Sequence, residues 1–141
     1  MRVANFPTFG ISIDNNATVV GLRITYSELI NNTVGLKSAS TAKITNRVGV
    51  MGQTDIFYGM NFLNNIVDGD NRAGSSGIYA AGEETFVPSF GEGKFNSAGI
   101  FNSTFRNFTA HGIYAENFTN GSIYNNTFNN CLLYTSDAAD E

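Results

Sequence analysis

The chain has 141 residues, of which 42% are hydrophobic, 13% aromatic and 14% charged, and its formal net charge is −4. This length suits one domain, and the aromatic content is too high for a disordered chain. No apolar run approaches the roughly 18 residues of a membrane-spanning helix, and no basic patch is present that would indicate nucleic-acid binding. We therefore expect a folded domain with no membrane span and no nucleic-acid partner.

Short apolar segments follow one another along the chain, and most alternate apolar with other residues, as in Val20, Leu22 and Ile24. A period of two over such short lengths predicts half-buried β-strands rather than helices. Glycines and asparagine pairs separate the segments, as expected for turns that need a positive φ. In chain order the predicted strands lie at 11–13, 20–24, 42–44, 48–50, 60–62, 77–80, 100–105, 112–115 and 123–128.

Two internal repeats indicate how these strands are arranged. Residues 100–107 (IFNSTFRN) align with residues 123–130 (IYNNTFNN) at an offset of 23, and five of eight positions are identical. The unit Gly-Ile-Tyr-Ala occurs at 77–80 and at 112–115, and weaker Gly-apolar openings begin at Gly10, Gly35 and Gly49. Such self-similarity is typical of solenoids. An antiparallel meander is the weaker alternative, because Asn-Gly, the usual two-residue hairpin loop, occurs once, at 120–121.

The repeats predict an all-β fold, a right-handed parallel β-helix (solenoid) of about five rungs, each about 23 residues long. We expect asparagines at equivalent bends to form amide ladders, with Asn102 over Asn125 and Asn107 over Asn130. We assign residues 1–8 to a lead-in, residues 9–130 to the β-helix with an insertion at about 68–97, and residues 131–141 to a tail. The predicted core residues are Ile24, Ile44, Phe62, Phe105 and Phe128.

The stretches 15–24 (NNATVVGLRI) and 112–130 (GIYAENFTNGSIYNNTFNN) resemble the generic repeats of the pectate-lyase-like superfamily of right-handed parallel β-helices. The resemblance covers most of residues 9–130. It implies a parallel β-helix, and it implies no particular enzyme.

The last eleven residues, 131–141 (CLLYTSDAADE), resemble translated sequencing-adapter sequence. That resemblance implies that the tail makes no rung, and that the chain is a fragment truncated at Asn130. An ordinary acidic tail is the alternative. Without these residues the chain carries eight basic against nine acidic residues, which is close to neutral.

Four residues are candidates for ligand binding: Asp68, Asp70, Arg106 and His111. Asp68 and Asp70 alternate like the start of a calcium loop. Two interpretations are therefore open: a calcium ion bound by Asp68, Asp70 and either Glu83 or Glu84, or a solvated acidic turn. His111-Gly112 is similar to the His-Gly motif of the superfamily's polygalacturonases, but the carboxylate pair that such hydrolases need is missing. Arg106 is a candidate by residue type only, because a polysaccharide lyase would use an arginine or a lysine as its base. No metal site or catalytic set is assigned.

The leading hypothesis is a secreted or cell-surface protein that binds or processes polysaccharide, with a polysaccharide or cell-surface glycan as partner. Tyr79, Tyr114 and Tyr124 are candidates to present rings to sugars on one flat face of the solenoid. If the chain is an enzyme, the resemblance implies a polysaccharide lyase or glycoside hydrolase. A non-catalytic surface or adhesin scaffold is the alternative, and a periplasmic β-helix protein of copper-enzyme maturation is a weaker one.

The chain contains more Asn-X-Ser/Thr sequons than its composition predicts. Two explanations are open: a glycosylated exterior, or a preference of β-helix corners for Asn-X-Thr. The sequons begin at Asn16, Asn31, Asn102, Asn107, Asn117, Asn120 and Asn125.

Overall fold

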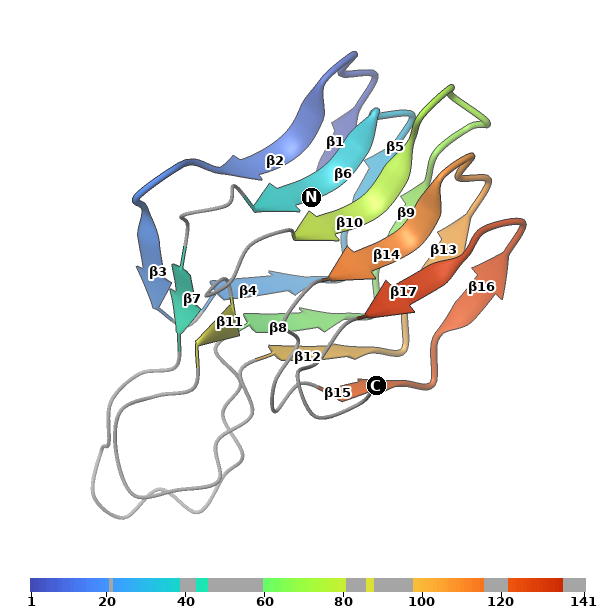
Figure 1. Ribbon diagram of the computed structural model, residues 1–141. Helices are drawn as coiled ribbons and strands as arrows, with labels where there is room; N and C mark the ends of the chain where they lie inside the picture. The colour runs from blue at the N-terminus through green and yellow to red at the C-terminus, as the bar shows by residue number, and fades with distance from the viewer. Residues whose placement is uncertain are drawn as a thin grey trace.

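The computed structural model describes residues 1–20, 22–38, 43–45, 60–80, 86–87, 98–115 and 122–135. Within these ranges the chain winds as a right-handed solenoid, and four β-sheets run along its axis (Figure 1). Every strand pairing in these ranges is parallel. The same ranges contain no helix long and apolar enough to cross a membrane. The prediction of an all-β parallel solenoid is confirmed, and the antiparallel meander is excluded for these strands.

The four sheets are named A to D in the order in which the chain first enters them. Sheet A contains β1 (Arg2–Ala4), β5 (Glu28–Ile30), β9 (Ile66–Asp68), β13 (Thr104–Arg106) and β16 (Thr127–Asn129). Sheet B contains β2 (Phe9–Ile13), β6 (Val34–Ser38), β10 (Ser76–Ala80), β14 (His111–Ala115) and β17 (Leu133–Thr135). Sheet C contains β3 (Thr18–Val20), β7 (Lys43–Thr45) and β11 (Phe86–Val87). Sheet D contains β4 (Leu22–Thr25), β8 (Met60–Leu63), β12 (Ala98–Phe101) and β15 (Ser122–Tyr124).

One coil of the solenoid runs through the sheets in the order A, B, C, D. Coil 1 is β1–β4, coil 2 is β5–β8, coil 3 is β9–β12, coil 4 is β13–β15, and coil 5 is β16 and β17. The predicted period of about 23 residues is correct for one step only. Equivalent positions of sheet A lie at Arg2, Glu28, Ile66, Thr104 and Thr127. Most of the additional residues of coils 2 and 3 lie between the sheet B and sheet D strands, so the three-sided pairing of sheets A, B and D is kept.

Both ends of the described chain contain strands that the sequence analysis did not assign. The lead-in 1–8 includes β1, which pairs with β5 because Arg2, Val3 and Ala4 continue the sheet A register. In the tail, β17 pairs with β14, so the expectation that residues 132–141 make no rung is wrong for Leu133–Thr135. The reason lies in the backbone and in Cys131: the Leu132 carbonyl accepts hydrogen bonds from the Gly112 and Ile113 amides, and Cys131 packs against the core, whereas the side chains of Leu132 and Leu133 are exposed. Residues 136–141 lie outside the described ranges.

Apolar side chains from sheets A, B and D fill the interior in columns, one residue per coil. Phe105 contacts Phe62 at a ring-centroid distance of 5.9 Å and lies in register with Phe128, whose ring is 5.3 Å away and nearly parallel to it. The predicted stack of Phe105 and Phe128 is confirmed, as is the burial of Ile24, Phe62 and Phe105. Phe128 is only partly buried, because β16 pairs with a strand on one side alone among the described residues. The side chain of Ile44 lies outside the description.

A column of glycines runs along the edge of sheet B that faces sheet A. A Cβ on Gly35 would lie 2.6 Å from the carbonyl oxygen of Gly77, and a Cβ on Gly77 would lie closer still to that of Gly112. Neither distance is compatible with a side chain, so the coils approach each other here only because no Cβ is present. The glycines of four predicted Gly-apolar openings form this column. They are Gly10, Gly35, Gly77 and Gly112. Gly49 lies outside the described residues.

The corner between sheets D and A is built on left-handed backbone. Asn64, Asn102 and Asn125 occupy equivalent positions with φ between 53° and 57°, and Tyr26 occupies the same position with φ 49°. Asn is among the few residues that tolerate this conformation. The sequons at Asn102 and Asn125 therefore begin at corner residues, which supports the corner explanation for their frequency.

The predicted amide ladders are wrong in position. Asn102 and Asn125 are exposed at the corner, and the hydrogen-bonded column lies one residue further on. There the Ser27 amide donates to Asn65 Oδ1, the Asn65 amide to Ser103 Oγ, and the Ser103 amide to Asn126 Oδ1. In this Ser/Asn column Ser27, Asn65 and Ser103 are buried and Asn126 is partly buried, so the side chains replace water as partners of the backbone amides. At the next corner, Asn107 and Asn130 donate to Asp68 and Asn71 rather than to each other.

Candidate functional site

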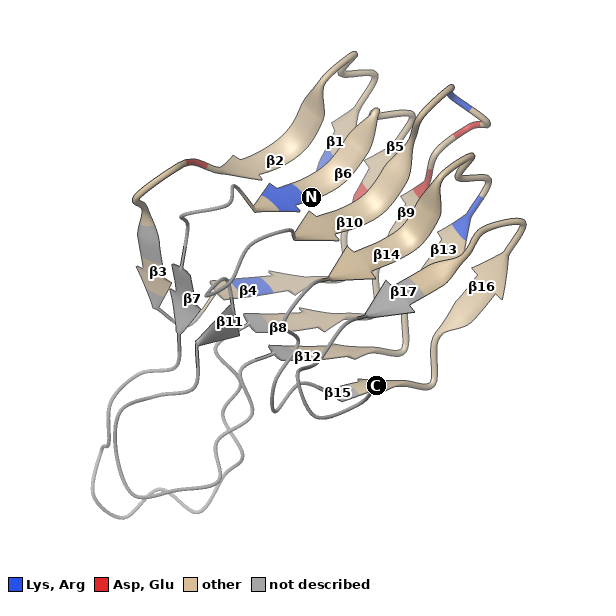
Figure 2. Ribbon diagram, in the orientation of Figure 1, with Lys and Arg blue, Asp and Glu red and all other residues tan. Residues whose placement is uncertain are grey.

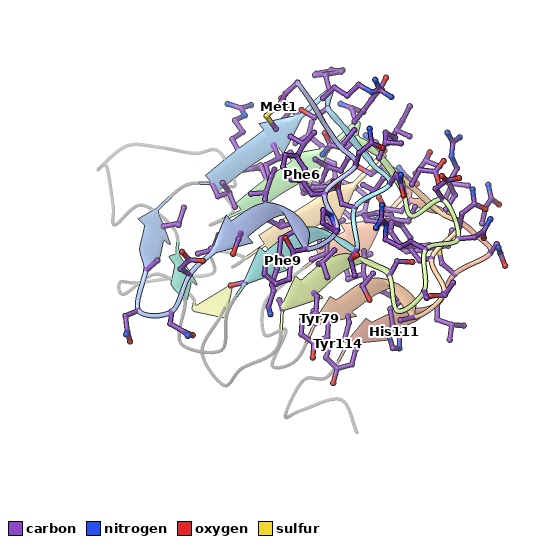
Figure 3. All side chains as sticks on the ribbon, turned by 90° about the horizontal axis from the view of Figure 1, so that it is seen from above. Met1, Phe6, Phe9, Tyr79, His111 and Tyr114 are labelled. Atoms are coloured by element: carbon purple, nitrogen blue, oxygen red, sulfur yellow. The ribbon has the colours of Figure 1, made fainter. Side chains whose placement is uncertain are left out.

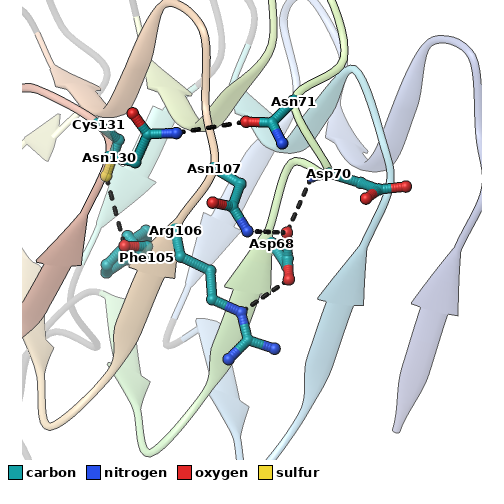
Figure 4. Close-up of polar contacts among 8 residues, drawn as sticks. All are labelled: Asp68, Asp70, Asn71, Phe105, Arg106, Asn107, Asn130 and Cys131. Carbon is teal, nitrogen blue, oxygen red and sulfur yellow. Dashed lines mark hydrogen bonds and ion pairs between the residues drawn. The ribbon is translucent and has the colours of Figure 1, made fainter.

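The acidic candidate Asp68 lies at the end of β9 and is held by the next coil (Figure 4). Its Oδ2 lies 2.7 Å from Nε of Arg106, and its Oδ1 accepts hydrogen bonds from the Asn107 side chain and the Asp70 amide. Burial alone would raise the pKa of Asp68. The hydrogen bond and charge of Arg106, together with the Asp70 and Asn107 bonds, outweigh burial and lower the pKa of this carboxyl below its usual range.

These contacts account for three of the four candidate ligand residues. Arg106 is paired with Asp68, so it is not a free base, and Asp70 is exposed with its amide turned to the same carboxylate. Among the residues that the structure describes, no group of three or more His, Cys, Asp or Glu side chains could hold a metal ion. Glu83 and Glu84, the other proposed calcium ligands, lie outside those residues. The Asp68–Arg106 pair joins coil 3 to coil 4.

The fourth candidate, His111, lies on a different surface. It is the first residue of β14 and lines an open hollow of about 460 Å³ on the outer face of sheet B. The hollow contains two tyrosines, a lysine and a serine besides the histidine, and none of its lining residues has a carboxylate. The lining residues are Val34, Lys37, Gly74, Ser76, Tyr79, Ala110, His111 and Tyr114.

The strand register brings the polar groups of the hollow into one row. Lys37, Tyr79 and Tyr114 are direct neighbours on β6, β10 and β14, and their side chains leave the outer face of the sheet. The rings of Tyr79 and Tyr114 stack with centroids 4.9 Å apart and planes 11° apart. His111 lies against Tyr114 at 5.2 Å with its ring tilted by 59°. Figure 3 shows the side chains of Tyr79, His111 and Tyr114 close together on one side of the solenoid.

Lys37 brings the positive charge of this surface. Its Nζ lies 4.4 Å from the ring centroid of Phe9, in the cation–π range. Among the described residues no acidic side chain forms an ion pair with Lys37. Figure 2 shows basic and acidic residues scattered over strands and corners, with a basic segment on β6, the strand that contains Lys37. The hollow thus combines hydroxyl, ammonium and imidazole groups with aromatic rings in a surface of low charge.

The third tyrosine named from the sequence does not belong to this surface. Tyr124 is on β15 in sheet D, where its ring stacks on Phe101 at 4.9 Å and 8°. The expectation that Tyr79, Tyr114 and Tyr124 share one flat face is therefore wrong, because the Ile-Tyr of β15 belongs to a different sheet from the Ile-Tyr of β10 and β14. Sequence analysis also missed Lys37. The signal was present, since Gly35-Leu36-Lys37 aligns with Gly77-Ile78-Tyr79 and Gly112-Ile113-Tyr114.

No family model, no curated protein and no solved structure matches the chain.

Proposed function

We propose that this chain binds polysaccharide through the hollow on sheet B. The observation that carries the proposal is the row of Lys37, Tyr79 and Tyr114, one side chain per coil, with His111 and Ser76 beside it. Aromatic rings with polar edges, together with a few placed hydrogen-bonding groups, are what a polyhydroxylated ligand needs. A row parallel to the solenoid axis suits an elongated ligand better than a compact one.

Binding is a better supported activity than cleavage. A glycoside hydrolase needs two carboxyl groups facing one another, and the lining of the hollow contains none. Asp68, the acid named from the sequence, is engaged with Arg106. As part of the same proposal, we place the chain in the pectate-lyase-like superfamily and at the cell surface or outside the cell. The four parallel sheets and the 23-residue step from coil 4 to coil 5 support the first assignment.

The rival function, a rigid scaffold without a ligand, draws support from the interior. The Ser/Asn column and the glycine column tie each coil to the next and would stiffen the solenoid whether or not it binds sugar. The two functions differ in what the outer face of sheet B is for.

The experiment is affinity electrophoresis of the 141-residue chain through gels that contain soluble polysaccharides, followed by titration calorimetry on any that retard it. We expect at least one polysaccharide to retard the chain, and Tyr79→Ala to weaken binding by about tenfold, which corresponds to ~1.4 kcal/mol. Tyr124→Ala is the matched control, since it removes a ring stacked at the same distance on sheet D. Equal effects of the two variants, or no retardation by any polysaccharide, would favour the scaffold.

A further inference from the structure

The corner between sheets A and B is longer in coil 3 than in its neighbours. Gly69 is equivalent to Asn31 and Asn107, and Ser76 is equivalent to Val34 and His111. Six residues, 70–75, therefore separate these positions in coil 3, against residues 32–33 in coil 2 and 108–110 in coil 4. This longer corner lies beside the hollow and contributes Gly74 to its lining. We call residues 70–75 the rim.

Both neighbouring coils hold the rim. On the coil 2 side, Arg72 donates from Nε to Asn31 Oδ1 and from Nη2 to the Asn31 carbonyl, at 3.1 and 3.2 Å. On the coil 4 side, the Thr109 hydroxyl donates to the Arg72 carbonyl and accepts from the Ser75 amide, while the Thr109 amide donates to Ser75 Oγ. Ala110 and Asn71 add backbone bonds across the same boundary. A loop tied at both sides is a fixed wall rather than a moving lid.

The middle of the rim projects from the surface, although its end at Ser75 is buried. A Cβ built on Gly74 would meet no heavy atom within 4 Å, and Asp70, Asn71 and Ala73 are exposed. The wall lies along the side of the hollow where Ser76, Ala110 and His111 line it, next to the row of Lys37, Tyr79 and Tyr114. A chain bound along that row has the wall on this flank.

We propose that the rim restricts the hollow to unbranched glycan chains, with Arg72 as the residue that positions it. The inference rests on the proposed polysaccharide binding. A linear chain lies along Lys37, Tyr79 and Tyr114 without meeting the wall, whereas a substituent that points toward Ser76 and His111 meets the backbone at Gly74. Arg72 itself touches Asn31 and acts only through the position of the rim.

The test measures affinity of the whole chain for three matched pairs of unbranched and branched glycans: linear and branched arabinan, mannan and galactomannan oligosaccharides, and cello- and xyloglucan oligosaccharides. We expect the wild-type chain to bind the unbranched member of its preferred pair about tenfold more tightly, a difference well within what a steric clash produces. In Arg72→Ala the ratio falls toward one, because the branched member gains affinity when the wall is released. Thr109→Val, which removes the hydroxyl contacts on the other side of the rim, changes the ratio in the same direction.

Arg2→Ala is the control, because Arg2 also joins two coils, through an ion pair with Glu28 at 3.4 Å, and neither residue contributes to the hollow or bonds the rim. Its ratio stays at the wild-type value. A merely structural role of Arg72 would lower both affinities together and leave the ratio unchanged, and that result would overturn the inference. Equal wild-type affinity for both members of a pair would overturn it too, while leaving polysaccharide binding intact. If the chain binds none of the six glycans, the inference is overturned, whereas the proposed function fails only if no polysaccharide retards the chain in affinity electrophoresis.

Discussion

Two stacked ring pairs on the outside of the solenoid have nearly the same geometry and different surroundings. Tyr79 and Tyr114 on sheet B, and Phe101 and Tyr124 on sheet D, both stack at 4.9 Å with planes within 11° of parallel. Stacking at this distance follows from the spacing of neighbouring strands, about 4.8 Å, whenever aromatic residues occupy equivalent positions of adjacent coils. The stack alone is therefore no sign of a binding site. The sheet B pair differs because a hollow, a lysine, a histidine and a rim surround it.

The largest expected loss of stability comes from a substitution in the interior ring stack, which lies beneath the outer faces of both sheets. Phe105 is fully buried between Phe62 and Phe128. Phe105→Ala should cost about 3–5 kcal/mol, because the cavity it leaves is enclosed by three sheets. Chemical denaturation monitored by circular dichroism measures this cost. A cost below about 1 kcal/mol would mean that the coils collapse around the missing ring or that the stack carries little of the stability.

The next substitution acts on the strand that carries Tyr79, one of the two rings of the sheet B pair. Gly77→Ala should destabilise the chain by about 1–3 kcal/mol, because the new Cβ meets the Gly112 carbonyl and the Phe105 ring. It also pushes apart the two strands that carry Tyr79 and Tyr114, so we expect glycan affinity to fall as well. Gly74→Ala is the control with open space around the Cβ, and its cost is limited to the left-handed backbone at φ 70°. Equal costs for both variants would contradict the close approach of the glycine column.

Tyr26 offers a change that stabilises the molecule without touching sheet B. It is the aromatic member of a corner position that Asn occupies in the three following coils, and it is 77% exposed. The left-handed conformation costs an ordinary residue about 1–2 kcal/mol and costs Asn less. We expect Tyr26→Asn to raise the free energy of unfolding by up to about 1 kcal/mol and to leave glycan affinity unchanged. A lower melting temperature in the variant would show that the Tyr26 ring contributes more than its exposure indicates.

The smallest expected effect is the pH dependence of folding stability that arises from the Asp68–Arg106 pair of sheet A. Because the pKa of Asp68 is lower in the folded chain, its ion pair stabilises the fold at pH above the ordinary value of about 3.9 and loses this contribution as pH falls through the folded value. The pair is partly exposed, so the contribution is about 1 kcal/mol or less. Urea titrations of the wild type and Asp68→Asn at neutral and acidic pH measure it. The difference between the two chains should shrink at acidic pH, and a constant difference would assign the effect to another carboxyl.

The sequence predicted the fold class well because a β-solenoid repeats its interactions locally. Ile24 and Phe105 lie between polar neighbours, and the Gly-apolar openings mark one corner, so much of the core and the glycine column follow from the sequence pattern. The period was predicted less well, because the additional residues of coils 2 and 3 carry no signal of which sheet they interrupt. The buried ladder was displaced by one residue, since Asn102 and Ser103 are both polar and only the left-handed backbone at Asn102 turns its side chain outward.

The sequence predicted individual candidate residues, but it did not predict which of them lie close together in the fold. Asp68, Arg106 and His111 attracted attention because they are ionisable, and the register then placed the first two in a pair between coils and the third in the hollow. Lys37 was not predicted, and the rim was predicted only as part of an insertion at about 68–97, without a place in the fold. Their role depends on which residues of neighbouring coils lie side by side. Because the coils differ in length, these neighbours cannot be found from a constant sequence spacing.

The Ser/Asn column bears on how many coils can be added to or removed from this solenoid at once. Serine and asparagine alternate along it, as Ser27, Asn65, Ser103 and Asn126. The two asparagines reach back to the preceding coil, donating to the Ile24 and Ile100 carbonyls, whereas the two serines donate to carbonyls of their own coil, at Thr25 and Phe101. Duplication or loss of a single coil would place two like residues in contact, but a change of two coils restores the alternation at the new junction. A change of two coils is therefore the smallest step that leaves the alternation of serine and asparagine in this column intact.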